Sequence, residues 1–181
     1  MIKELEKYID RELISADEIS RRVKELGAEI TKDYEGQSVI MVCILRGASV
    51  FFADLVREID VDLSMDFMVI SSYGSGTTSS GEVKLIKDLS EGIKGKNVIV
   101  VEDIVDTGLT LSNLKAILAA REPASVKICT LLDKPSRRTV DLTPDYVGFT
   151  IPNEFVVGYG LDWAERYRQL KNICTIDTSK I

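Results

Sequence analysis

Three apolar runs of strand length constrain this chain more than any other feature of its sequence. They span residues 38–45, 97–101 and 125–132, and segments with helical spacing of apolar residues lie between them. A strand that is apolar at every position is buried on both faces, as in a parallel sheet covered by helices. Alternation of strand and helix also gives the right-handed crossovers that parallel pairing requires. The sequence therefore predicts an α/β fold with a central parallel sheet flanked by helices.

The remaining elements follow from shorter patterns. Residues 15–35 carry apolar side chains at helical spacing and begin with a capping box formed by Ser15 and Glu18. Segment 71–82, SSYGSGTTSSGE, is nearly all Gly, Ser and Thr and predicts a loop. With 181 residues and no repeat or linker, the chain is expected to form a single domain over residues 1–181. Further helices are expected over 48–59 and 110–120, and further strands over 63–70, 83–89, 146–149 and 173–176.

Composition removes several functional classes. There is no histidine, which excludes Ser-His-Asp and Cys-His catalysis, a histidine proton shuttle and imidazole-bound zinc. The net charge of −6 argues against a nucleic-acid partner. No apolar stretch reaches the length of a signal core or a membrane span, so no membrane partner is expected. Three dispersed cysteines, Cys43, Cys129 and Cys174, indicate buried reduced thiols and a cytoplasmic location.

The segment NVIVVEDIVDTGLTL, residues 97–111, is the clearest candidate for a site. In it a strand leads into acidic residues, then a Gly-containing turn, then a helix, and ligands of open parallel sheets bind beyond such strand ends. The turn 106–110 offers backbone N–H groups, two hydroxyls and a helix N-terminus, which together suit a phosphate group. Glu102 and Asp103 suit sugar hydroxyls, directly or through Mg²⁺-bound water. A capped helix start with solvated acids is the alternative, and the absence of a GxxxxGK[ST] motif argues against a P-loop enzyme.

Five segments in a shared order resemble the type I phosphoribosyltransferases, and among them the bacterial hypoxanthine-guanine branch. They are ILRGASVFFADL (44–55), SSYGSGTTSSGEVK (71–84), VVEDIVDTGLTL (100–111), LLDKPSRR (131–138) and FVVGYGLDWAERYRQL (155–170). The resemblance implies the fold of that family, with a small hood subdomain formed by N-terminal residues and about 140–181. It also implies transfer of the 5-phosphoribosyl group from phosphoribosyl pyrophosphate to hypoxanthine, and to guanine as a second base, with Mg²⁺ as cofactor. The products would be inosine or guanosine monophosphate and pyrophosphate, while the preference among hypoxanthine, guanine and xanthine stays open.

The resemblance also implies roles for residues of the 97–111 segment. Glu102 and Asp103 would hold the ribose hydroxyls and Mg²⁺, and Asp106 would be the candidate general base at the purine N7. Leu109 stands where some relatives carry a basic side chain, so phosphate binding would depend on N–H groups and hydroxyls. The residues expected to contact the ribose 5-phosphate part of the substrate are Ile104, Asp106, Thr107, Gly108, Leu109 and Thr110.

Other resembling segments imply the rest of the site. Leu45-Arg46-Gly47 matches a pyrophosphate loop in which the peptide before the basic residue can be cis, and Arg168 matches a second pyrophosphate position. Taken alone, Arg46 would be a solvated strand cap and Arg168 a surface arginine. Within the loop 71–82, Ser72 and Tyr73 would be the catalytic lid residues, whereas a plain hairpin connection is the alternative.

Base recognition is expected in the C-terminal part. Lys134 would donate to the 6-oxo group and so reject adenine, which carries an amino group there. Phe155 would stack on the purine, the backbone at Val156 would read the base edge, and Asp162 would hold a second Mg²⁺. A turn lysine at 134 and ordinary core packing at 155 are the alternatives for these two positions.

Two other functions remain open from the sequence. One is an RNA-binding regulator of pyrimidine genes on the same fold, against which the acidic net charge argues. The other is a nucleotide-binding module without activity, against which the combination of three acids and a lid segment argues. Under the leading hypothesis, the protein binds hypoxanthine or guanine, phosphoribosyl pyrophosphate and pyrophosphate. It would also bind copies of itself, as a homodimer or homotetramer.

Overall fold

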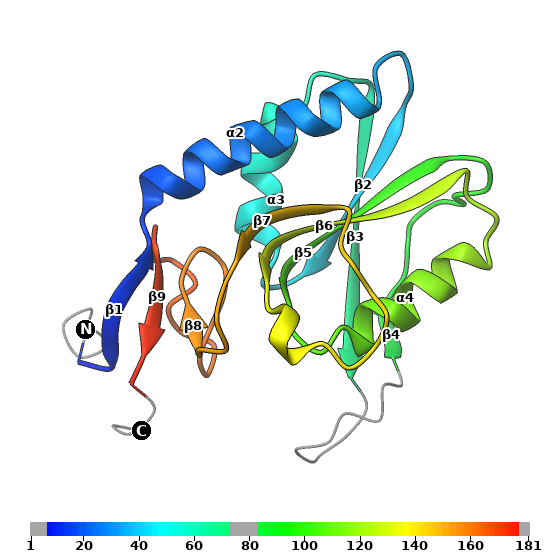
Figure 1. Cartoon of the computed structure of the whole chain (residues 1–181). Helices are drawn as coiled ribbons and strands as arrows, with labels where there is room; N and C mark the ends of the chain where they lie inside the picture. Colours follow the sequence, from blue (N-terminus) through cyan, green and yellow to red (C-terminus); the bar gives the residue numbers. More distant parts are fainter. Residues whose placement is uncertain (1–6, 73–82, 178–181) are drawn as a thin grey trace.

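The computed structural model describes residues 7–72 and 83–177, and its largest element is a six-stranded sheet (Figure 1). The strand order is β4-β3-β2-β5-β6-β7. All neighbours pair in parallel except β4, which runs antiparallel to β3 at one edge. The α/β fold with a central parallel sheet is thereby confirmed. The strands are β2 (Val39–Leu45), β3 (Leu63–Ser72), β4 (Val83–Lys87), β5 (Asn97–Val105), β6 (Ser125–Asp133) and β7 (Tyr146–Thr150).

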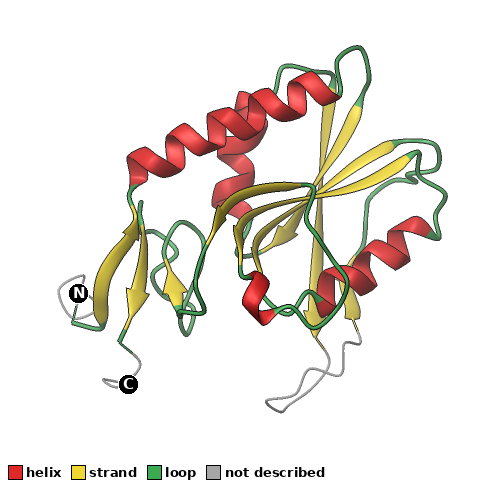
Figure 2. Ribbon diagram, viewed as in Figure 1, coloured by secondary structure: helices red, strands yellow, loops and turns green. Residues whose placement is uncertain are grey.

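Helices cover both faces of this sheet, which explains the continuous apolar strands. Met41 and Cys43 of β2 belong to a buried cluster with α2 (Ala16–Asp33) and α3 (Ser49–Leu55). Val42 and Ile44 belong to a second cluster with α4 (Leu109–Ala119). Successive side chains of a strand point to opposite faces, so each residue of the run finds an apolar neighbour. Figure 2 shows α2 and α3 on one side of the sheet and α4 on the other.

Each helix begins within one residue of its predicted start, and all three end earlier than predicted, α4 by a single residue. The capping box at α2 is present: the N–H of Ser15 donates to Glu18 Oε2 at 2.9 Å, and the N–H of Glu18 donates to Ser15 Oγ at 3.3 Å. Helix α2 ends at Asp33 rather than residue 35. Helix α3 stops at Leu55 and a short 3₁₀ turn, Val56–Glu58, completes the segment predicted as one helix. No helix within residues 7–72 and 83–177 has both the length and the apolar character to cross a membrane.

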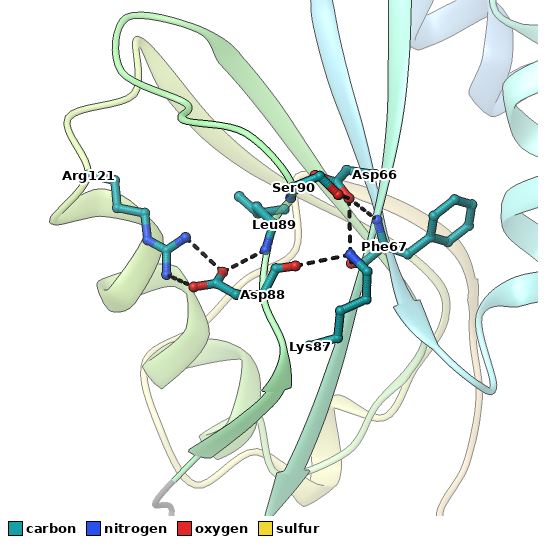
Figure 3. Close-up of polar contacts among 7 residues, drawn as sticks. All are labelled: Asp66, Phe67, Lys87, Asp88, Leu89, Ser90 and Arg121. Carbon is teal, nitrogen blue, oxygen red and sulfur yellow. Dashed lines mark hydrogen bonds and ion pairs between the residues drawn. The ribbon is translucent and has the colours of Figure 1, made fainter.

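The antiparallel edge of the sheet is held by a polar network (Figure 3). The Asp66 carboxylate on β3 accepts from the N–H of Ser90 at 2.7 Å and from Lys87 Nζ at 3.4 Å. Asp88 makes a two-pronged ion pair with Arg121, both distances being 2.8 Å. Burial raises the pKa of Asp66, but its hydrogen bonds outweigh this effect and hold the pKa below its ordinary value. Strand β4 therefore ends at Lys87, two residues before the predicted end, because residues 88–90 turn back onto these partners.

A second, three-stranded antiparallel sheet joins the two ends of the chain in the order β1-β9-β8. Its strands are β1 (Ile9–Ile14), β8 (Val156–Val157) and β9 (Ile173–Ile176). Figure 1 shows this sheet beside the amino-terminal end of α2. Strand β7, which lies within the segment expected for the hood, pairs with β6 in the large sheet instead. The small sheet thus draws on residues 9–14 and on the chain after residue 155.

All three cysteines are buried and none forms a disulfide. Burial raises the pKa of the Cys43 thiol to about 12, and the nearby acids Glu102 and Asp103 add to the rise. A thiol with such a pKa stays protonated near neutral pH and is a poor nucleophile. The expectation of buried reduced thiols is confirmed.

Candidate active site

The carboxyl ends of β2 and β5 border a pocket of about 330 Å³. This is the edge of an open parallel sheet at which ligands bind. Larger hollows lie beside α2, one of about 600 Å³ that includes Arg57 and one of about 1030 Å³ that includes Asp60, but neither reaches these strand ends. The residues around the strand-end pocket are Ile44, Leu45, Gly47, Ile70, Glu102, Asp103, Ile104, Val105, Asp106, Thr107, Gly108, Thr110 and Leu111.

The turn between β5 and α4 presents the start of a helix to this pocket. Gly108 has φ +83° and is the N-cap of α4, whose first residue is Leu109. That left-handed conformation is one that glycine adopts readily. Glycine has no side chain to cap the helix, and the N–H of Leu109 makes only a long contact of 3.4 Å with Thr107 Oγ1, so the helix start suits an anion. The hydroxyls of Thr107 and Thr110 border the same space.

Arg138 contacts this turn and stabilises it. The sequence did not predict this contact. Its guanidinium donates to the backbone carbonyl of Asp106 at 3.1 Å and pairs with the Asp133 carboxylate at the end of β6. A Cβ at Gly108 would lie 2.9 Å from Arg138 Cδ, so the arginine stem packs directly on the glycine. The N–H of Thr139 also donates to the carbonyl of Thr107 at 3.0 Å. The turn is therefore fixed by the chain that follows β6.

Glu102 and Asp103 are adjacent acids in the last part of β5. The N–H of Asp103 donates to Glu102 Oε1 at 3.1 Å, and the N–H of Ile104 donates to Asp103 Oδ1 at 2.7 Å. Burial raises the pKa of Glu102 well above its ordinary range, and the neighbouring Asp103 carboxylate raises it further. Burial also raises the pKa of Asp103. A bound cation or a pair of hydroxyl donors would stabilise these two acids in their charged form.

The turn after β2 lies against the same acids. The Leu45–Arg46 peptide bond is cis, as the resemblance allows. A Cβ at residue 47 would overlap the carboxylate of Asp103, so only glycine fits between the turn and the acid. The Arg46 side chain is 69% exposed and donates to Glu165 Oε1 at 2.6 Å.

Asp106 and Lys134 lie on the side of the site that faces β6. Asp106 Oδ1 accepts from Arg137 Nε at 3.1 Å, and both side chains are about half exposed. Lys134 is only 7% exposed, and its Nζ donates to the carbonyl of Glu154 at 2.6 Å. Burial lowers the pKa of Lys134, while the Asp106 charge works in the opposite direction. Lys134 is thus a buried donor and not an ordinary turn lysine.

The segment around Phe155 places an aromatic ring at the surface. Phe155 is 46% exposed, which contradicts ordinary core packing at this position. Val156 is buried in β8, and the carbonyl of Phe155 accepts from the N–H of Ile176 at 3.1 Å. Lys134 donates a hydrogen bond to the carbonyl of Glu154, the residue that directly precedes Phe155. The buried lysine therefore contacts the chain one residue before the exposed ring. An exposed ring next to a buried donor is an arrangement suited to a planar heterocycle.

Arg168 and Asp162 come from the same C-terminal segment and bind each other at 2.7 Å. Arg168 also donates to the carbonyl of Gly160 at 2.7 Å. The other oxygen of Asp162 accepts from the N–H of Glu165 at 2.8 Å. Asp162 is therefore engaged by its own segment. Within the described part of the chain, no three Cys, Asp or Glu side chains gather closely enough to hold a metal ion by themselves.

The expected lid residues are only partly described. Ser72 is the last residue of β3, whereas Tyr73 lies outside the described residues. Three functional neighbours were missed from the sequence: Arg137, Arg138 and the Glu154 carbonyl. The two arginines stand in the charged run LLDKPSRR, which was a usable signal, but the carbonyl carries no signal in the sequence.

The sequence matches the phosphoribosyl transferase domain over residues 12–163. It is 53% identical over 165 residues to the hypoxanthine-guanine phosphoribosyltransferase of Bacillus subtilis, covering 91% of this chain and 92% of that protein. It is also 54% identical over 165 residues to the bifunctional protein TilS/HprT of Listeria monocytogenes. There the match covers 91% of this chain but 26% of the relative, so the chain spans about a quarter of that protein's length.

Solved structures show the same likeness. A hypoxanthine phosphoribosyltransferase from Staphylococcus aureus superimposes with a TM-score of 0.94 at 46% identity, covering 97% of this chain and 96% of that one. A hypoxanthine-guanine phosphoribosyltransferase from Bacillus anthracis gives a TM-score of 0.90 at 51% identity, covering 93% and 99% of the two chains. The central sheet, the small sheet and the connections between them are therefore common to this chain and those proteins.

Proposed function

This chain belongs to the phosphoribosyltransferase family, and from that premise we propose that it transfers the 5-phosphoribosyl group of phosphoribosyl pyrophosphate to hypoxanthine or guanine. It would thereby act in purine salvage. One arrangement carries the proposal: the acid pair of β5, the helix-start turn at Gly108 and the cis turn before Gly47 all border one pocket. The hypoxanthine-guanine phosphoribosyltransferases that match more than nine-tenths of the chain support the choice of base.

The reaction exchanges one bond at the anomeric carbon for another. The bond from that carbon to the pyrophosphate oxygen breaks, pyrophosphate leaves with the electron pair, and a purine nitrogen forms the new bond. The proton that the purine loses would go to the Asp106 carboxylate, which stands at the pocket border. Because positive charge develops on the sugar, catalysis would consist of positioning the substrates and stabilising that charge. Glu102 and Asp103 would contribute to both.

Base selection follows from Lys134 and Phe155. The ammonium of Lys134 would donate to the 6-oxo group of hypoxanthine or guanine, while the exposed Phe155 ring would stack on the base. Adenine carries a donor at the same position, so two donors would face each other and the ammonium would gain no acceptor from the base. The backbone at Val156 would read the other edge of the base.

The acid pair suits Mg²⁺. Its oxygen donors are of the kind that this ion prefers, and Mg²⁺ characteristically uses one or two carboxylates with water and substrate oxygens as its other ligands. Two acids without a third protein ligand fit that pattern. Mg²⁺ would neutralise charge on the departing pyrophosphate, and Glu102 and Asp103 would orient the ribose hydroxyls beside it. Asp162 would hold a second ion.

The proposed setting is a cytoplasmic homodimer or homotetramer without a nucleic-acid partner. Three free, buried thiols suit a reducing compartment. The net charge of −6 disfavours binding to a polyanion.

A base-by-base assay tests the proposal. Purified protein with Mg²⁺ and phosphoribosyl pyrophosphate should convert hypoxanthine and guanine, and leave adenine unchanged. Asp106→Asn should lower kcat by about 10²- to 10⁴-fold, the range of general acid–base catalysis. Asp141→Asn, at an exposed acid outside the pocket, is the matched control and should retain activity. If no purine base is converted, the proposed activity is contradicted, and RNA binding would be tested next.

A further inference from the structure

Glu165 bridges two arginines that come from different parts of the chain. Its Oε1 accepts from Arg46 at 2.6 Å, and its Oε2 lies 3.4 Å from a guanidinium nitrogen of Arg168. The two oxygens of one carboxylate are thus divided between two guanidinium groups. Arg46 and Glu165 are mostly exposed, whereas three-quarters of the Arg168 side chain is covered. No role in the reaction was expected for Glu165.

The backbone that presents Glu165 is unfavourable for this residue. Trp163 and Arg166 exchange backbone hydrogen bonds of 3.0 and 3.2 Å across a two-residue turn. The two central residues, Ala164 and Glu165, have φ values of +50° and +63°. Turns of this kind favour Gly, Asn or Asp at such positions. A non-glycine pair in the left-handed region persists only when its surroundings fix it, and such outliers concentrate at functional sites.

A short chain of contacts links this turn to the pocket. Arg168 donates to the carbonyl of Gly160, and Gly160 packs so closely on the carbonyl of Gly47 that a Cβ would overlap it. Gly47 in turn lies against the Asp103 carboxylate. The Arg168 charge also acts on Asp103 and lowers its pKa against the effect of burial. Neither arginine borders the strand-end pocket itself, and Arg168 lines the neighbouring hollow of about 600 Å³. Arg168 is linked to the acid pair through Gly160 and Gly47, and Arg46 directly precedes Gly47.

We propose that Glu165 is an internal counterion, which occupies the two pyrophosphate-binding arginines in the free enzyme and must be displaced when pyrophosphate or its sugar ester binds. The assignment of pyrophosphate to Arg46 and Arg168 rests on the proposed function. A carboxylate and a phosphate group each accept hydrogen bonds from a guanidinium group in the same geometry, so the two compete for one arginine. Arg46 must release Glu165 before the ligand engages it, and Arg168, which also pairs with Asp162 at 2.7 Å, must give up its 3.4 Å contact with Glu165. Both losses weaken binding of the substrate and speed departure of the product.

Direct measurement of pyrophosphate binding tests this competition. Sodium pyrophosphate would be titrated calorimetrically, with Mg²⁺ present, into the wild type and Glu165→Gln. A second variant, Glu165→Asn, removes the charge with a residue that tolerates positive φ, so it keeps the test valid if the glutamine variant folds poorly. Glu122→Gln is the matched control, because Glu122 forms an exposed ion pair of 2.6 Å with Lys94 outside the pocket and the change in net charge is the same.

Both Glu165 variants should bind pyrophosphate about three- to tenfold more tightly than the wild type, since exposed ion pairs are individually weak and Glu165 makes two. The control should match the wild type. Raising the salt from about 0.05 M to about 0.5 M should narrow the difference, because salt screens exposed charges.

Three results would overturn the counterion role: an unchanged affinity, a weaker affinity that marks Glu165 as a support for the arginines, or no pyrophosphate binding by any protein. Turnover of hypoxanthine by the wild type is a separate readout. If the Glu165 variants bind pyrophosphate more tightly but no purine is converted, the proposed function fails while the counterion stands.

Discussion

Lys134 Nζ donates to the backbone carbonyl of Glu154 at 2.6 Å, and this bond ties the end of β6 to the residue before Phe155. The contact joins segments 20 residues apart and sets a buried donor beside an exposed aromatic ring. It also satisfies the ammonium while no base is bound, which matters because an unpaired buried charge is costly. Under the proposed function, this lysine would donate to an acceptor in the plane of a stacked base.

Replacing Lys134 with methionine tests this role. Lys134→Met should lower kcat/KM for hypoxanthine by about 10- to 100-fold, because a hydrogen bond to a charged group contributes about 1.5–3 kcal/mol. Discrimination against adenine should shrink at the same time, since the donor that opposes its amino group is gone. Steady-state assays with both bases provide the comparison. Lys94→Met, at an exposed lysine outside the pocket, should leave both rates near wild type.

Glycine at position 47 should be irreplaceable. In Gly47→Ala the new methyl group would occupy the space of the Asp103 carboxylate, so the acid or the turn must move. We expect kcat to fall by about 10²-fold, the effect of a displacement of roughly 1 Å at a reacting centre. Gly92→Ala is a matched control because a Cβ there meets nothing within 4 Å. If both variants retained full activity, tight packing of the turn on Asp103 would have no catalytic importance.

The large sheet was predictable because its main strands can be recognised from the apolar pattern of their own residues. Strand β2 is apolar throughout, and β5 and β6 contain apolar runs, a pattern that has few interpretations once helices alternate with such strands. Strand β5 nevertheless continues to Val105, past the acids where the predicted strand ended. The small sheet was only partly predicted. Half of the residues of strand β1, IDRELI, are charged and exposed, and β8 has two residues, so both exist only because β9 pairs with them.

The candidate site, too, was predictable only in part. Residues 102–110 were predictable because strand, acids, glycine and helix follow one another without interruption. Glu165 and Arg138 were not, since each acts through contacts with residues distant in the sequence or with backbone atoms. Lys134 and Phe155 lie between these cases. The family resemblance implied base binding for both, but burial of one and exposure of the other depend on the fold.

Asp66 should make the stability of the protein depend on acid pH. Its pKa is lowered in the folded state, so its contribution is fully present above the unfolded value near 3.8 and is lost as the pH falls through the lower folded value. Asp66→Asn should therefore destabilise the protein by about 1 kcal/mol at pH 7, or about 2–4 °C in Tm. The difference from wild type should shrink in thermal melts as the pH falls below the unfolded value of 3.8. A constant difference across pH 3–7 would contradict the role of the Asp66 charge.

Arg138 should combine a stabilising role with a role in phosphate binding. The Arg138 and Asp133 side chains are 13% and 12% exposed, so Arg138→Met leaves a carboxylate buried without its partner. Breaking one side of such a pair costs about 3–5 kcal/mol. The double variant Asp133→Asn with Arg138→Met removes the orphaned charge and should recover a large part of that loss in urea unfolding experiments.

Activity should not recover with stability in this double variant. The bond from Arg138 to the carbonyl of Asp106 and the packing of its stem on Gly108 are lost in both variants. The helix-start turn would then sample other conformations, and only some of them align its N–H groups on a phosphate. We expect the KM for phosphoribosyl pyrophosphate to rise about tenfold in both variants, while the KM for hypoxanthine changes little. Recovery of the KM together with stability would show that Arg138 serves the fold alone.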